Sequence, residues 1–172
     1  MLVIMAGLPA SGKSTLARAL ANCVSGAVLD KDVIRAALFS AEDIEYSAVQ
    51  DDFVMDLMLQ AAQYLLDKDA GRVVFLDGRT FSYSYQRQRA MDFADAMGTP
   101  WRIIECVCAD AIARRRLAED ERTGRHLAAN RTVHLYESVR SIFEPIPEPK
   151  IVIDTGEPLG TCVRAGLTGI KD

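Results

Sequence analysis

Short apolar runs alternate along the chain with longer segments whose apolar positions recur at helical spacing. The runs have strand length and are bounded by turn or charge signals. They predict five strands, at residues 2–6, 27–29, 73–76, 103–108 and 151–153. The segments between them predict helices at about residues 14–24, 32–39, 46–69, 83–97, 110–120, 131–143 and 158–167. This alternation favours an α/β fold.

The expected strands are apolar on both faces, as the run Val-Val-Phe-Leu at residues 73–76 illustrates. Strands of this kind belong in a parallel sheet that is covered by helices on each side. We therefore predict a doubly wound three-layer sandwich around a five-stranded parallel sheet. Ligands of such sheets bind beyond the carboxyl ends of the strands. The first candidates for a site are therefore the residues that follow each strand, namely 7 onward, 30–35, 77–80, 110 and 154–156.

The length of 172 residues suits one domain of ordinary size, so we expect a single unit over residues 1–172. Between about residues 118 and 131 the apolar pattern lapses into a charged stretch with a glycine, which predicts a mobile lid. The net charge of −4 argues against a general nucleic-acid binder, because polyanion affinity comes largely from clustered Lys and Arg. The sequence shows no signal-like leader and no apolar run near the ~20 residues that span a bilayer. We expect a cytoplasmic enzyme with no membrane partner.

The segment GLPASGKST at residues 7–15 follows the first expected strand and opens the first expected helix, which is the context that a phosphate-binding loop requires. Its glycines allow successive amides to face phosphate oxygens, and the helix adds its positive dipole end. Lys13 is expected to reach the β- and γ-phosphates of ATP, and the Ser14 hydroxyl to ligate Mg²⁺. The nucleotide-binding candidates in this loop are Gly7, Ala10, Ser11, Gly12, Lys13, Ser14 and, as a weaker hydroxyl candidate, Thr15.

Carboxylates follow two of the other strands. Asp77 ends the third strand, a position from which it can hold magnesium directly or through water. A helix cap or turn is the alternative interpretation of Asp77. Asp32 follows the second strand and is our candidate for the base that takes a proton from an acceptor hydroxyl, although the spacing does not exclude Asp30. Asp32 could also cap the next helix.

Arg35 lies one helical turn beyond Asp32. It is expected to bind the acceptor or a phosphate bidentately, with a surface ion pair as the alternative. We find no Asn-Lys-x-Asp segment that would read guanine, which disfavours a GTPase and favours a kinase.

These residues resemble the small P-loop kinases that are similar to polynucleotide 5′-kinase, chloramphenicol phosphotransferase and zeta toxins. The resemblance covers most of the chain and rests on the segments GLPASGKST, Asp32-x-x-Arg35, Phe-Leu-Asp at 75–77, Leu-Tyr-Glu-Ser-Val at 135–139 and Phe-Glu-Pro at 143–145. It implies the P-loop NTPase fold, MgATP as the donor, Asp32 as the base and an arginine-rich lid. Matched by its distance from Tyr136, Arg122 is the lid's expected catalytic arginine. Arg116 is a second candidate or stacks on adenine.

The chain departs from polynucleotide kinases after Asp77, where Gly78-Arg79-Thr80 replaces a small polar pair. This departure makes nucleic-acid acceptors less expected than small molecules. Arg79 is a candidate for binding the acceptor, together with the tyrosines and arginines of the following helix. An exposed basic face is the simpler alternative for that helix, and a solvated charged face for the lid arginines.

Three functions remain open: a small-molecule kinase, a kinase of nucleic-acid 5′ ends, and a non-catalytic nucleotide-binding or ATPase module. The sequence names neither the acceptor nor the oligomeric state.

Overall fold

Five parallel strands form the central sheet, and their spatial order is β2-β3-β1-β4-β5. The fold is known from a computed structural model that describes residues 1–123 and 132–171. The strand at the centre of the sheet, β1, is also the first in the chain. The strands are β1 (Leu2–Ala6), β2 (Gly26–Asp30), β3 (Val73–Asp77), β4 (Trp101–Val107) and β5 (Ile151–Asp154).

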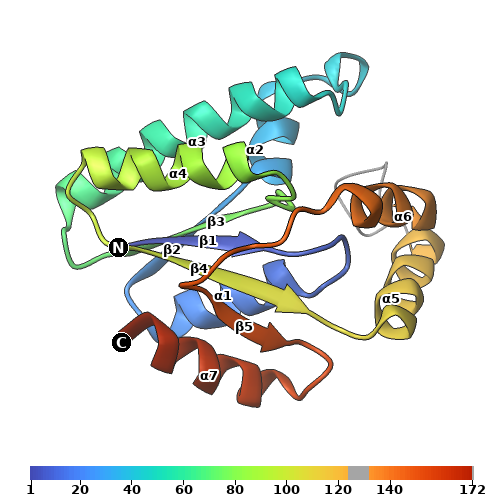
Figure 1. The fold of residues 1–172 in the computed structure, drawn as a ribbon. Coiled ribbons are helices and arrows are strands. Elements are labelled where there is room, and N and C mark those ends of the chain that lie inside the picture. The colour runs from blue at the N-terminus through green and yellow to red at the C-terminus, as the bar shows by residue number, and fades with distance from the viewer. Residues whose placement is uncertain (124–131, 172) are drawn as a thin grey trace.

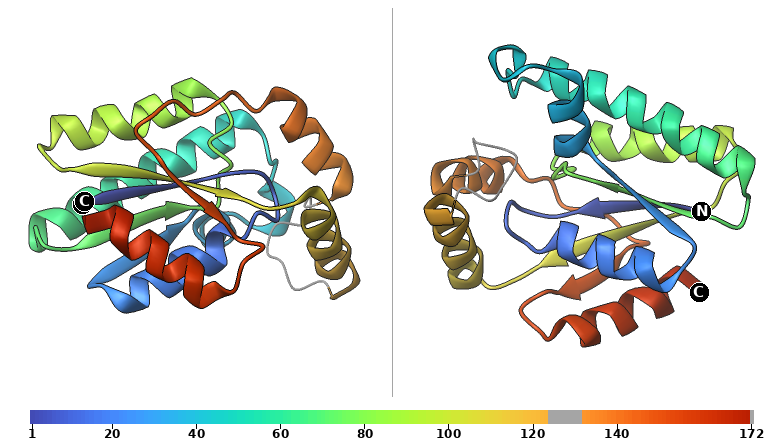
Figure 2. Two further views of the ribbon diagram at one scale, coloured as in Figure 1. Left: turned by 60° about the horizontal axis from the view of Figure 1, so that its bottom comes forward. Right: turned by 180° about the vertical axis from the view of Figure 1, so that it is seen from behind.

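Helices cover both faces of the sheet (Figure 1). The helices are α1 (Lys13–Cys23), α2 (Lys31–Leu38), α3 (Ala48–Lys68), α4 (Ser84–Ala96), α5 (Asp110–Thr123), α6 (Val133–Ile142) and α7 (Leu159–Lys171), with one 3₁₀ turn at Ala41–Asp43. Helices α2, α3 and α4 lie on one face, and both views of Figure 2 show α1 and α7 together on the other. Helices α5 and α6 stand beyond the carboxyl ends of the strands.

Two apolar cores result from the alternation of side chains along β1. Leu2 and Ile4 point to one face and pack with Met58 of α3 in one core. Val3 and Met5 point to the other face and pack with Leu16 of α1 in the second core. Because successive strand residues face opposite sides, a run that is apolar at every position needs a helical layer on each side.

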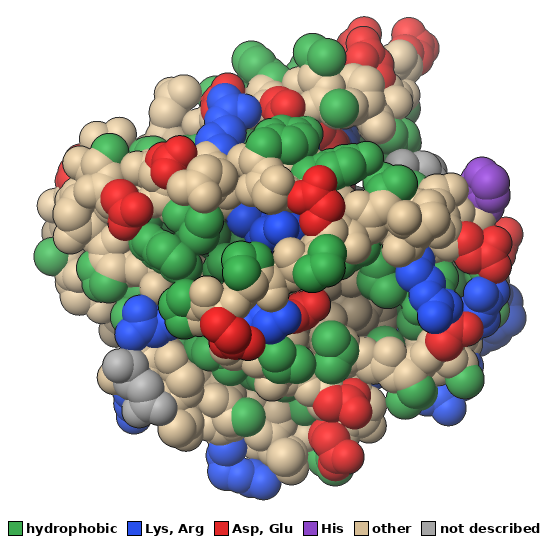
Figure 3. Space-filling model, viewed as in Figure 1, with side chains coloured by type: hydrophobic (Ala, Val, Ile, Leu, Met, Phe, Trp, Pro, Cys, Tyr) green, Lys and Arg blue, Asp and Glu red, His purple; other side chains and the backbone are tan. Residues whose placement is uncertain are grey.

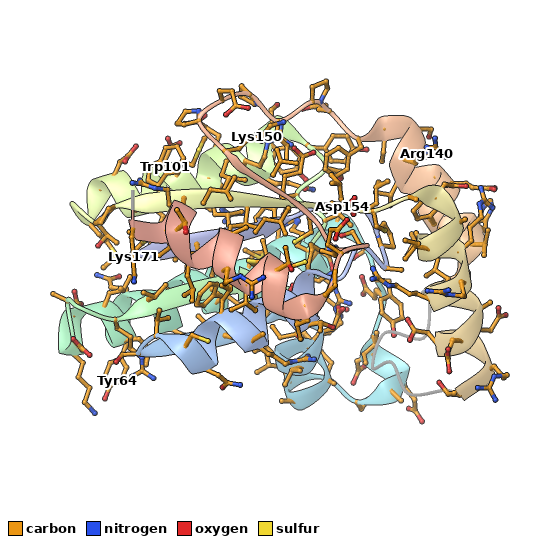
Figure 4. The ribbon with its side chains drawn as sticks, turned by 90° about the horizontal axis from the view of Figure 1, so that it is seen from below. Tyr64, Trp101, Arg140, Lys150, Asp154 and Lys171 are labelled. Carbon is orange, nitrogen blue, oxygen red and sulfur yellow. The ribbon has the colours of Figure 1, made fainter. Side chains whose placement is uncertain are left out.

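The carboxyl ends of the strands meet at one edge of the sheet. Figure 4 shows Asp154, the last residue of β5, at the end of the sheet near α5, whereas Trp101 and Lys171 lie at the opposite end. Asp30 and Asp77 are register partners at the ends of β2 and β3. Any side chain that follows a strand therefore starts close to its counterparts from neighbouring strands.

The predicted doubly wound α/β sandwich with five parallel strands is confirmed, and the element boundaries differ by a few residues. One difference concerns the expected lid at 118–131. Residues up to Thr123 continue helix α5, and residues 124–131 lie outside the described residues, so the lid stays a prediction. Among the helices that the structure describes, none combines the length and apolarity needed to cross a bilayer.

Candidate active site

The loop between β1 and α1 lies so close to the neighbouring strands that two of its positions admit only glycine. Gly7 has a φ of 138°, and a Cβ built there would stand 2.3 Å from the carbonyl oxygen of Cys106 on β4. Gly12 has a φ of 82°, and its Cβ would stand 2.9 Å from the Thr155 hydroxyl beyond β5. The loop backbone is thus wrapped over the strand ends in a conformation that L side chains rarely adopt.

Lys13 begins helix α1 and turns its side chain back over this loop. Its ammonium group donates hydrogen bonds of 2.9 Å to the carbonyl oxygens of Gly7 and Leu8. Ser14 follows at the first turn of the helix, where unpaired amides and the helix dipole favour an anion. Ser14 and Thr15 both line the cavity described below.

Arg116 of α5 ties the same loop to the end of β5. Its guanidinium donates to the carbonyl oxygen of Ala10 at 3.1 Å and to that of Thr155 at 2.7 Å. The Thr155 hydroxyl in turn donates to the carbonyl oxygen of Ser11 at 2.7 Å. The predicted nucleotide-binding arginine therefore reaches the phosphate-binding loop, and in this structure it holds backbone carbonyl groups.

Asp77 lies next to the loop and carries a buried carboxylate. Its side chain is fully buried, and neither carboxylate oxygen has a hydrogen-bond partner within residues 1–123 and 132–171. Burial raises the pKa of the Asp77 carboxyl, while the nearby Ser14 hydroxyl and Lys13 ammonium oppose that rise. The residue ends a strand rather than capping a helix. A buried unpaired carboxylate beside a hydroxyl is suited to a hard divalent cation such as Mg²⁺.

The two aspartates after β2 have different surroundings. Asp30 is the N-cap of α2: its side chain accepts from the amide of Asp32 at 3.0 Å and pairs with Arg18. Asp32 is therefore not needed as the cap. Both residues line the cavity, and the Asp32 carboxylate accepts from Arg35 at 3.2 Å. Of the two candidates that the sequence left open, the geometry favours Asp32 as the group available to an acceptor.

A network of paired charges surrounds Asp32. Arg35 is only 2% exposed and donates to both Asp32 and Asp51, and its guanidinium lies 5.0 Å from the ring centre of Tyr46. Lys31 contacts the two oxygens of Asp51 at 2.8 and 2.9 Å. Burial lowers the pKa of Lys31 to about 8, opposed by Asp32 and reinforced by nearby arginines. Arg35 thus supports carboxylates inside the protein rather than forming a surface ion pair; direct binding of an acceptor by Arg35 stays a prediction.

Arg79 occupies a comparable position after β3. It is 5% exposed and pairs with Asp52 of α3 at 2.6 Å, and it reaches the hydroxyl of Tyr85 at 3.5 Å. The expected basic face of α4 is divided: Arg87 is buried and donates to backbone carbonyl groups, whereas Arg89 is exposed and pairs with Asp56.

One cavity of about 870 Å³ joins the loop to this charged region. Residues from the phosphate-binding loop, α2, α3, β3–α4 and α5 line it together, among them Lys13, Ser14, Asp32, Asp51, Arg79 and Arg116. Its volume lies within the range of small-molecule and cofactor sites. The cavity can therefore hold a phosphate donor and a second molecule side by side.

Two residues that the sequence singled out lie elsewhere. Arg122 has an exposed side chain that pairs with Glu119 of the same helix, 3.3 Å away. Asp110 is exposed at the start of α5, where Arg114 and Arg140 hold its pKa below the usual range. The structure does not bring either residue into the lining of the cavity; a catalytic role for Arg122 stays a prediction.

Sequence reasoning did not identify Asp51 and Asp52 as site residues, and it included Lys31 only within the candidate segment 30–35, without a role. Asp51 lies in the first turn of α3 and Asp52 follows it, about twenty residues beyond Asp32, and no short motif links the two segments. The only feature of the sequence that could have drawn attention to them is their negative charge near the start of a helix. That feature is also typical of ordinary surface helices.

A family model described as "AAA domain" matches residues 2–145. No curated protein sequence matches the chain. The Mycobacterium tuberculosis APS kinase CysC, solved in complex with AMPPNP and APS, has a TM-score of 0.75 and 19% identity, with 99% of this chain and 97% of that chain covered.

Two further solved structures share the fold. A gluconokinase from Sinorhizobium meliloti 1021 has a TM-score of 0.67 and 18% identity, over 98% of this chain and 90% of that chain. Chaetomium thermophilum Kti12, in complex with ADP-AlF3, has a TM-score of 0.68 and 17% identity, over 99% of both chains. At these identities the likeness shows the fold alone, a P-loop kinase-like nucleotide-binding fold, and it agrees with the resemblance to P-loop kinases that the sequence indicated.

Proposed function

The chain belongs to the AAA domain family, and from that premise we propose that it is an ATP-dependent kinase that transfers the γ-phosphoryl group of MgATP to a hydroxyl group of a small molecule. The observation that carries this proposal is the position of Asp32. Its carboxylate lines the same cavity as Lys13 and Ser14 and is not used as a helix cap. A module that only binds a nucleotide has no need of such a carboxylate on the other side of the cavity.

The chain's residues fit MgATP. The absence of a Cβ at Gly7 and Gly12 lets the loop backbone lie against Cys106 and Thr155 at the strand ends, and Lys13 provides the charge for the β- and γ-phosphates. Within the described residues no three acidic, His or Cys side chains gather as a metal site. Ser14 and Asp77 would therefore hold Mg²⁺ as a pair, with the remaining ligands coming from phosphates and water, which is how proteins commonly bind this ion.

In the proposed reaction, Asp32 orients the acceptor hydroxyl and accepts its proton while the hydroxyl oxygen forms a bond to the γ-phosphorus. The bond between that phosphorus and the oxygen that bridges the β- and γ-phosphates breaks, and ADP leaves with the electron pair of that bond. Lys13 balances the negative charge on the transferring group in the cavity. Arg122 is proposed to add a second positive charge there, as the resemblance implies.

Two of the structural neighbours are named as kinases of small molecules, an APS kinase and a gluconokinase, which supports this acceptor class. The charge distribution also disfavours a polynucleotide. The cations beside Asp32 are already paired with aspartates. On the face shown in Figure 3, acidic and basic side chains are interspersed rather than gathered by sign. A strand of nucleic acid would need a continuous positive groove.

The test is consumption of MgATP by the purified protein against a panel of sugars, nucleosides, antibiotics and 5′-hydroxyl oligonucleotides, with Asp32→Asn alongside. We expect one acceptor class to stimulate turnover. The variant should bind ATP as the wild type does while its kcat falls by about 10²–10⁴-fold, the contribution of a general base. Unchanged turnover in Asp32→Asn would show that Asp32 is not the general base. Stimulation by oligonucleotides alone would replace the small-molecule acceptor with a nucleic-acid end.

A further inference from the structure

Three cations and three carboxylates are linked by ion pairs on the acceptor side of the cavity, and all except Arg35 and Asp52 are in its lining. We call this set the acceptor cluster, and its members are Lys31, Arg35, Arg79, Asp32, Asp51 and Asp52. Each cation has an aspartate partner: Lys31 and Arg35 share Asp51, Arg35 also holds Asp32, and Arg79 holds Asp52. The cluster is therefore balanced in charge before any acceptor enters.

The cations of this cluster are buried and the carboxylates are more accessible. The side chains of Lys31, Arg35 and Arg79 are 8%, 2% and 5% exposed, whereas those of Asp51 and Asp52 are 22% and 32% exposed. In the cavity lining, an entering molecule meets the carboxylates of Asp32 and Asp51 beside the paired cations of Lys31 and Arg79. Carboxylates are hydrogen-bond acceptors, and the groups that they bind are donors such as hydroxyls.

Arg35 holds two of these carboxylates side by side. One terminal nitrogen of its guanidinium contacts Asp32 and the other contacts Asp51. Because a guanidinium is a rigid planar fork, the two carboxylates cannot drift apart without losing a charge-assisted hydrogen bond. Asp32 and Asp51 are both in the lining of the cavity, so they offer two adjacent acceptor groups to one molecule.

The same cavity has an apolar side. Leu135, Val139 and Ile142 of α6 line it, and so does Tyr83, whose ring is stacked on Tyr85 with 5.8 Å between the ring centres. Apolar and aromatic surfaces favour the carbon face of a ring or chain. The cavity therefore combines paired carboxylates with an apolar surface.

Resting on the proposed kinase function, we infer that the acceptor is an uncharged molecule with two neighbouring hydroxyl groups and an apolar face. Asp32 receives the hydroxyl to be phosphorylated, and Asp51 receives the adjacent hydroxyl. Asp51 is thus a specificity-determining residue. An acceptor with a carboxylate, phosphate or sulfate at this position would face the oxygens of Asp51. Within the described residues, Lys31, Arg35 and Arg79 are each already paired with an aspartate and are not free to compensate for that repulsion.

The experiment measures binding by calorimetry in the presence of AMPPNP, so that its result does not depend on turnover. The ligands are sugars and nucleosides with neighbouring hydroxyls, each compared with its deoxy analogue and with its carboxylate or phosphate derivative. We expect a neutral diol to bind at least about tenfold more tightly than either derivative, because a missing hydroxyl leaves a polar group unpaired. Preference for the anionic derivative, equal binding of the deoxy analogue, or no binding by any neutral diol would overturn the inference.

The variant Asp51→Asn tests the residue itself. The substitution should lower the affinity for the neutral diol by about tenfold. Because it removes one negative charge, it should also reduce the discrimination against the anionic derivative. Asp56→Asn is the matched control, since Asp56 lies on the same helix in an exposed pair with Arg89 outside the cavity lining, and it should leave both affinities unchanged. An Asp51→Asn protein that binds both ligands as the wild type does contradicts the assignment.

The two proposals fail in different ways. Binding of the neutral diol without phosphoryl transfer would contradict the proposed kinase function and agree with the inferred binding preference. Phosphoryl transfer to an anionic acceptor would agree with the proposed kinase function and contradict the inferred preference for a neutral acceptor. If Asp51→Asn does not fold by circular dichroism, the comparison of the three ligands on the wild-type protein still decides the inference.

Discussion

The two halves of the cavity are built in different ways. The nucleotide half is formed mainly by the loop at residues 7–15, a continuous stretch of chain whose backbone conformation depends on glycines. Side chains contact this loop through its backbone carbonyl groups, as the hydrogen bonds from Lys13 and Arg116 illustrate. The acceptor half is assembled from side chains of α2, α3 and the β3–α4 segment, held in place by ion pairs. A loop formed by consecutive residues can bind the same ligand in many proteins, whereas a cluster of side chains is free to change with the acceptor.

This contrast predicts which substitutions act on every substrate and which act on one. Changes in the nucleotide half should affect all acceptors alike, because they alter the donor. Changes in the acceptor half should alter the preference among acceptors.

Within the nucleotide half, the largest effect is expected for Lys13→Ala. Loss of the ammonium removes the charge that balances the phosphates, so kcat should fall by about 10²–10³-fold, with a weaker affinity for ATP. Steady-state kinetics with two unrelated acceptors measures this. The fold-loss should be the same with both, and intact phosphoryl transfer in Lys13→Ala would contradict the role of the phosphate-binding loop.

The next largest effect is expected in the acceptor half, where the buried Lys31 should make the free energy of unfolding depend on pH. Burial lowers the pKa of Lys31 from 10.5 in the unfolded chain to about 8 in the folded protein. Between these pH values the unfolded state binds more protons, so the contribution of Lys31 to the free energy of unfolding rises with pH. The rise is roughly 3 kcal/mol at most, since a tenfold difference in proton affinity corresponds to about 1.4 kcal/mol.

Urea unfolding of the wild type and of Lys31→Met measures this rise at about pH 7 and about pH 10. The wild type should gain stability relative to the variant as pH increases. Lys68→Met, at the exposed end of α3, is the control. A difference between wild type and Lys31→Met that does not change with pH would exclude a titrating, buried Lys31.

The smallest effect should distinguish the two arginines of α5. Arg116→Ala removes the hydrogen bonds to Ala10 and Thr155, so the KM for ATP should rise by about tenfold, as for the loss of a charge-assisted hydrogen bond, while the KM of the acceptor stays unchanged. Arg122→Ala should lower kcat and leave the KM for ATP unchanged if Arg122 acts on the transferring group. A normal kcat in Arg122→Ala would limit that residue to its exposed pair with Glu119.

Much of the fold could be predicted from the sequence because the signals are local. The apolar run at residues 73–76 predicts a buried parallel strand by itself, and GLPASGKST predicts a loop between a strand and a helix from consecutive residues. The order of the strands in the sheet was not predicted, since it depends on contacts between segments that are far apart in the chain.

The candidate site divides in the same way. By itself the sequence placed the loop at residues 7–15 after β1, Asp77 at the end of β3 and Asp32 after β2, because each position is marked by a recognisable strand. Their roles in binding and catalysis stay predictions. Only the tertiary structure distinguishes Asp30, which caps α2, from Asp32, and only it brings Asp51 and Asp52 of α3 to the cations of α2 and β3–α4. The physical reason is that capping and ion pairing depend on distances between side chains, which the order of residues does not specify until the helices pack on the sheet.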